Sequence, residues 1–101
     1  MEERKDIRMK QYEGMFILKP DLDKTGIDKI LNQIHELIAK YKGAMLDTKE
    51  MGKNRMAYPL KKYKEGVYYL INFNVMPDAI AAIKKSIVLN DAILRMMIVE
   101  T

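Results

Sequence analysis

The residues best suited to chemistry lie in one segment, residues 49–64, where cations surround a tyrosine. This segment holds six Lys and Arg residues and one acid, Glu50, which leaves a local charge of +5. The whole chain of 101 residues has a formal net charge of +4, so the remainder is close to neutral. A basic block confined to one segment indicates a polyanionic partner more strongly than evenly scattered lysines would.

Tyr58 lies in the middle of this basic segment. Lysine and arginine can neutralise phosphates, and a tyrosine ring can stack on an unpaired base. Pro59 lacks a backbone donor, so this part of a strand pair must be an edge, a bulge or a loop. From the residues alone, two interpretations stay open. One is an RNA-binding surface, and the other is a solvated hairpin whose lysines discourage aggregation between sheets.

No pattern typical of catalysis or metal binding is present in the sequence. Without cysteine, disulfides and thiolate sites are excluded, and His35 has no second ligand spaced to meet it. Three acids, Asp21, Asp23 and Asp28, cluster where a helix is predicted to start, and the helix dipole already favours them there. Glycine-rich phosphate loops are absent. We therefore expect no enzyme, no cofactor, no metal and no small-molecule substrate.

The sequence predicts a cytoplasmic protein without membrane segments. No apolar run approaches the roughly 20 residues that span a bilayer. The first six residues, Met-Glu-Glu-Arg-Lys-Asp, are charged and lack the apolar stretch of a signal peptide.

The elements that position the basic segment follow from hydrophobic periodicity. Residues 11–19 alternate as a strand with Tyr12, Gly14, Phe16 and Leu18 on its core face. A helix is then expected to be capped by Thr25 and to end at Gly43 in a left-handed conformation. Its apolar stripe comprises Ile27, Ile30, Leu31, Ile34, Leu37, Ile38 and Tyr41.

The second half of the chain predicts three more strands and a shorter helix. A weak strand is expected over 44–51, and a strong one has Val67, Tyr69, Ile71, Phe73 and Val75 facing the core. Pro77 opens the helix, which buries Ile80, Ile83 and Ile87. The last strand would place Leu94, Met96 and Ile98 on the core face, opposite Arg95, Met97 and Val99.

The resulting order, β-α-β-β-α-β, predicts an α+β ferredoxin-like sandwich. Right-handed crossovers give a four-stranded antiparallel sheet with both helices on one face. The other face is left for water or a partner, and Met15, Ile17 and Met97 would form an apolar patch on it. Partner docking and ordinary partial exposure both explain such a patch.

From Met9 to about Val99 the chain resembles the bacterial small-subunit (30S) ribosomal protein six (S-six) family. The most specific motif is residues 52–60, GKNRMAYPL, which resembles the family block G-x-[RK]-x-L-A-Y-P-I. Asn54 departs from this block, because the family is often basic there. Three further motifs agree in order and spacing: Tyr12-Glu13, Leu18-Lys19-Pro20-Asp21-Leu22 and Asn90-Asp91-Ala92-Ile93-Leu94-Arg95. Residues 1–8 would be an N-terminal extension, and 9–101 a single domain.

The resemblance implies a structural component of the small ribosomal subunit. Such a protein binds the central domain of 16S rRNA together with ribosomal protein eighteen, as a heterodimer. The residues carried over by position as RNA or partner contacts are Lys53, Arg55, Lys61, Lys62 and Arg95, with Tyr58 for stacking or for the protein-eighteen interface. Their division between RNA and protein stays open at this point.

Two other functions share the predicted topology. A free-standing RNA-recognition-type domain would need a cation before Gly66 and aromatic residues at fixed steps after it. Glu65, Val67 and Asn72 occupy those positions instead. A dimeric small-molecule regulatory domain would need a pocket with convergent polar groups, and the sequence shows no such group of residues.

Overall fold

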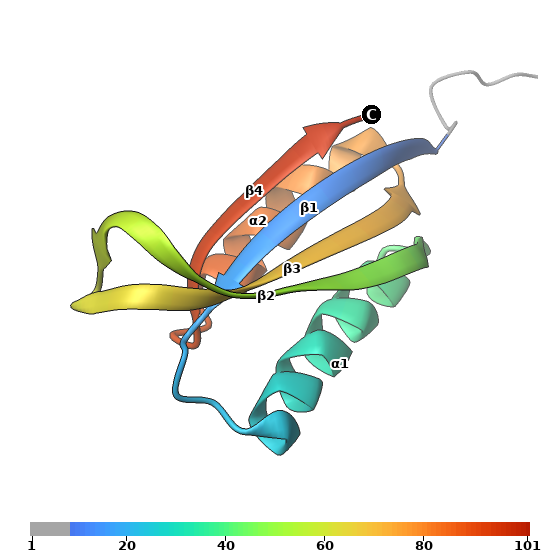
Figure 1. Ribbon diagram of the computed structural model, residues 1–101. Coiled ribbons are helices and arrows are strands. Elements are labelled where there is room, and N and C mark those ends of the chain that lie inside the picture. The colour runs from blue at the N-terminus through green and yellow to red at the C-terminus, as the bar shows by residue number, and fades with distance from the viewer. Residues whose placement is uncertain (1–8) are drawn as a thin grey trace, which may run out of the picture.

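The computed structural model describes residues 9–101, and the predicted extension at 1–8 lies outside the described residues. The described strands form one antiparallel sheet in the order β2-β3-β1-β4, with both helices on one face (Figure 1). The predicted ferredoxin-like sandwich is therefore confirmed. In chain order the elements are β1 (Lys10–Leu18), α1 (Lys24–Lys40), β2 (Ala44–Leu60), β3 (Tyr63–Val75), the 3-10 turn η2 (Pro77–Ala79), α2 (Ile80–Val88) and β4 (Ile93–Glu100).

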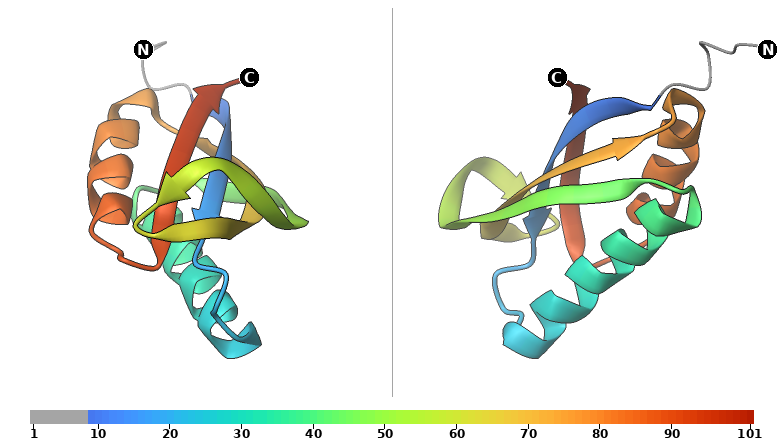
Figure 2. Two further views of the ribbon diagram at one scale, coloured as in Figure 1. Left: turned by 60° about the vertical axis from the view of Figure 1, so that its left-hand side comes forward. Right: turned by 90° about the vertical axis from the view of Figure 1, so that its right-hand side faces the viewer.

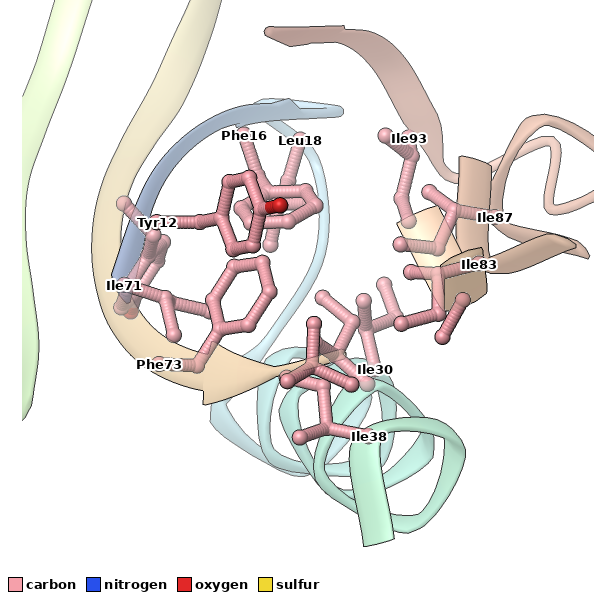
Figure 3. Close-up of a cluster of buried hydrophobic side chains, with 14 of the residues drawn as sticks. Tyr12, Phe16, Leu18, Ile30, Ile38, Ile71, Phe73, Ile83, Ile87 and Ile93 are labelled. Carbon is pink, nitrogen blue, oxygen red and sulfur yellow. The ribbon is translucent and has the colours of Figure 1, made fainter. Parts of the chain in front are cut away.

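The main core lies between the sheet and the helices (Figure 3). The central strands contribute alternate residues, as predicted, and α1 contributes Ile30, Ile34 and Ile38 at helical spacing. Burying one such side chain stabilises the fold by about 1.5–3 kcal/mol. The largest fully buried side chains are Phe16, Phe73, Leu18, Ile38, Ile71, Ile83 and Val75.

Both predictions about the ends of α1 are wrong. The N-cap is Asp23, whose Oδ1 accepts a hydrogen bond from the backbone N–H of Gly26 at 2.8 Å, and Thr25 lies inside the first turn. An aspartate caps as well as a threonine, and its charge also suits the positive end of the helix dipole. At the other end, the left-handed residue is Lys42, with φ of 63°.

Gly43 is required by close packing. A Cβ at this position would collide with the backbone carbonyl oxygen of Asn74 and would lie 2.8 Å from Cγ2 of Ile38. The glycine therefore lets the end of α1 approach β3 directly.

Leu94 lies on the opposite face from the one predicted. The pairing of β1 with β4 shifts between Ile17 and Leu18, so that Ile17 faces Arg95 while Leu18 faces Ile93. This bulge turns Leu94 away from the helices, and Ile93 takes its place in the main core. Beyond the bulge, Met96 and Ile98 pack against the main core as predicted.

The β2–β3 hairpin is longer than predicted and folds back over the open face of the sheet. In Figure 2 (left view) it crosses in front of β1 and β4. Met56 packs there against Ile17 and Leu94, and all three are buried. The expectation of an exposed Ile17 is therefore wrong, since the side chain is only 8% exposed. Met97, at 51% exposure, stays open.

The cap assignment makes a prediction about stability. Replacing Asp23 with alanine should lower the free energy of unfolding by about 1 kcal/mol, because an amide of the first turn loses its acceptor. Thr25→Ala should change it by less than about 0.5 kcal/mol. Urea denaturation of both variants measures the difference, and a larger loss for Thr25→Ala would contradict the assignment.

Candidate nucleic-acid and protein interface

The hairpin belongs to an edge strand whose pairing is irregular. β2 pairs only with β3 in the sheet, and its register shifts between Glu50 and Gly52 and again between Arg55 and Leu60. Gly52 sits at the first shift with φ of 90°, a conformation that favours glycine. Pro59 falls within the second shift, as its missing donor requires.

The strand register places Lys53 and Arg55 on the same face of the hairpin as Val67. Lys53 lies opposite Val67, which is buried in the main core, and Arg55 lies opposite Glu65. Because side chains alternate along a strand, the neighbouring Met56 points to the other face. Both cations are exposed, and no described carboxylate lies within 4 Å of their side-chain nitrogens.

Lys61 and Lys62 form the two-residue turn of the hairpin. Leu60 pairs with Tyr63, and the lysines between them have φ of 49° and 73°. Positive φ at both positions is typical of a type I′ turn, which favours Asn-Gly. Lysine in this conformation costs about 1 kcal/mol per residue. The turn therefore holds two exposed cations at positions where other residues would be more stable.

Tyr58 and Arg95 line one hollow on the open face of the sheet. Together with Met56, Leu60 and Met97 they line a hollow of about 220 Å³. The tyrosine comes from β2 and the arginine from β4, and Figure 2 (left view) shows the hairpin crossing in front of β4. Tyr58 is 64% exposed, so its ring remains available to a partner.

The predicted residues thus divide between two faces and a turn. Lys53 and Arg55 lie on the helix side of the hairpin, whereas Tyr58 and Arg95 lie on the open face. Lys64 was absent from the predicted site, yet it lines a second hollow of about 290 Å³ next to Arg55. The position of Lys64 within the basic segment could have identified it.

The remaining candidates take no part in this arrangement. His35 is exposed on α1, away from the hairpin. Within residues 9–101, no group of three or more His, Cys, Asp or Glu side chains is placed to hold a metal ion. Among the described helices, none has the length and apolar character needed to cross a membrane.

Comparison with known proteins identifies the family. The model of the ribosomal protein S6 family matches residues 11–100. Small ribosomal subunit protein bS6 of Gloeobacter violaceus is 37% identical over 90 residues, which cover 89% of this chain and 94% of that protein. The bS6 protein of Caldanaerobacter subterraneus subsp. tengcongensis is 34% identical over 93 residues, covering 92% and 98%.

A solved structure agrees with the fold. The crystal structure of 30S ribosomal protein S6 from Thermotoga maritima matches with a TM-score of 0.85 at 23% sequence identity. The match covers 93% of this chain and 89% of that one. The chain therefore belongs to the ribosomal protein S6 family, a family of small-subunit ribosomal proteins and not of enzymes.

Proposed function

We propose that this chain is a structural component of the small ribosomal subunit that binds the central domain of 16S rRNA together with ribosomal protein eighteen. The observation that carries the proposal is the exposure of the hairpin cations. Lys53, Arg55, Lys61 and Lys62 are exposed and have no described carboxylate within 4 Å. Cations left without internal partners are available to neutralise phosphates.

RNA contacts are assigned to the helix-side face and the turn of the hairpin. Only a few phosphates can be neutralised there, so the affinity of the isolated chain for RNA should be weak. Each phosphate contact adds about 0.7 to 0.9 to the slope of log affinity against log salt. A second basic protein that shares the RNA would supply the missing charge, which supports joint binding with protein eighteen.

Protein contacts are assigned to the hollow on the open face. Tyr58, Arg95 and Met97 line it, and these residue types are enriched in the buried centres of protein interfaces. Exposed Val99 extends the apolar surface along β4. A side chain of protein eighteen that entered this hollow would be held between an aromatic ring and a cation.

The same hollow argues against a free-standing RNA-recognition-type domain. That domain stacks bases on aromatic residues of an open sheet. Here the corresponding strand presents Tyr68 to the open face, where the folded-back hairpin packs against it and leaves it half-buried. Tyr68 therefore cannot serve as a fully open stacking surface.

Charge reversal of the hairpin tests the RNA assignment. The double variant Lys53→Glu, Arg55→Glu should lose the ternary complex with 16S rRNA and protein eighteen, because it places acids where phosphates would bind. Its melting temperature should fall only slightly, because both side chains are exposed, although glutamate at position 55 would lie opposite Glu65. Gel-shift titration with a central-domain RNA measures the first effect and calorimetry the second.

The matched control is Lys84→Glu, Lys85→Glu, which makes the same charge change at exposed positions on α2. This control should retain most of the binding. An equal loss of RNA binding in both variants would mean that the effect comes from net charge alone. Unaltered assembly of the hairpin variant would exclude Lys53 and Arg55 from the site.

A replacement of the two turn lysines tests whether the turn contacts RNA, and it should change stability and RNA binding in opposite directions. Replacing Lys61-Lys62 with Asn-Gly should raise the free energy of unfolding by about 1–2 kcal/mol, because these residues suit positive φ at both positions. RNA binding should weaken, and the salt slope should fall by about 1.5 if both lysines neutralise phosphates. Thermal unfolding and salt titration check the two effects. A slope equal to that of the unmodified chain would exclude the turn from the RNA contact.

A further inference from the structure

A hollow on the helix side of the sheet lies apart from the basic hairpin. The first turns of α1 stand away from the sheet (Figure 2, right view), and a space of about 560 Å³ opens there toward β2 and β3. Its apolar lining comes from Ile27 and Leu31 of α1 and from Tyr69 of β3. Its charged lining comes from Lys24, Asp28 and Glu50.

Tyr69 is a buried side chain whose hydroxyl has no hydrogen-bond partner among residues 9–101. Its exposure is 7%, and no described residue makes a hydrogen bond with its hydroxyl. Buried phenol groups normally have such a bond. Burial, and then the carboxylates of Glu50 and Asp28, raise the pKa of Tyr69 above its ordinary value. A tyrosine hydroxyl is protonated at neutral pH even without this shift. It can therefore both donate and accept a hydrogen bond.

Two carboxylates lie beside this tyrosine. Glu50 lies directly opposite Tyr69 in the β2–β3 register, and Asp28 faces it from α1. Among residues 9–101, no cation lies within 4 Å of either carboxylate, although the chain contains 18 Lys and Arg residues. The hollow therefore combines an aromatic floor, apolar walls and two acids that have no described cation within 4 Å, and it would repel phosphate.

We propose that this hollow binds an arginine side chain from a neighbouring basic protein. The aliphatic stem of arginine would pack on Ile27 and Leu31. Its planar guanidinium would lie near the Tyr69 ring, with Asp28 and Glu50 accepting its N–H groups. Lys24 is the one cation in the lining and opposes this binding. The site thus gives the chain a protein contact separate from its proposed RNA surface, and it does not depend on the proposed function.

The test is an NMR titration of the isotope-labelled full chain with a blocked pentapeptide, Gly-Ser-Arg-Ser-Gly. We expect saturable shifts at the Ile27 and Leu31 methyl groups and at the Tyr69 ring. Binding should weaken about tenfold in Tyr69→Phe, because a hydrogen bond to a charged group is lost. It should be lost in Asp28→Asn, Glu50→Gln, and Lys24→Gln should strengthen it severalfold.

Controls separate the site from general charge effects. Asp78→Asn, Asp91→Asn makes the same charge change at exposed positions near the ends of α2 and should bind the peptide normally. A peptide with citrulline in place of arginine should not bind. Shifts that do not saturate, or that persist in Asp28→Asn, Glu50→Gln, would overturn the proposal. Tighter binding of spermidine than of the peptide would assign the hollow to polyamines and also overturn it.

Discussion

The packing of Met56 on Ile17 and Leu94 determines how the chain presents its proposed binding residues. A two-stranded hairpin that projects from a sheet is only marginally stable alone. Here three apolar side chains are buried where the hairpin crosses the open face, and each contributes about 1.5–3 kcal/mol. The contact also requires the bulge in β4, since that bulge turns Leu94 toward the hairpin. Together, the buried contact and the bulge hold the hairpin against the sheet.

The packing of the hairpin on the sheet explains why the basic residues are divided between two faces. This packing places Tyr58 and Arg95 around one hollow, while the strand register places Lys53 and Arg55 on the same face as Val67. The cations also protect an edge strand, because charged residues, bulges and proline all discourage pairing with another sheet. The two interpretations that the basic segment left open are therefore compatible. The same lysines that keep the edge solvated are available to phosphates.

The fold could be predicted because its signals are periodic and local. Alternation identified the core faces of β1 and β3, and the helical stripe identified α1. The caps could not be resolved, because Asp23 and Thr25 are both good capping residues two positions apart. Gly43 was correctly singled out for the wrong reason, since close packing against β3 depends on tertiary structure.

The site was predicted as a segment and not as a surface. The GKNRMAYPL motif located the basic hairpin, but nothing in the residue pattern indicated the bulge in β4 or the packing of the hairpin over the open face. The sequence therefore gave no indication that Tyr58 and Arg95 would line the same hollow. The Tyr69 hollow was also missed, because alternation assigned this tyrosine to the core and gave no indication that its hydroxyl lacks a partner.

Hydrogen–deuterium exchange of a Met56→Ala variant tests the role of this contact most directly. Truncation of this buried side chain should cost about 2 kcal/mol. If the contact holds the hairpin against the sheet, amides of residues 54–66 should exchange much faster in the variant than in the unmodified chain. The paired amides of β1 and β4 should keep most of their protection. Unchanged exchange in the hairpin, or an equal loss of protection throughout the sheet, would contradict the account.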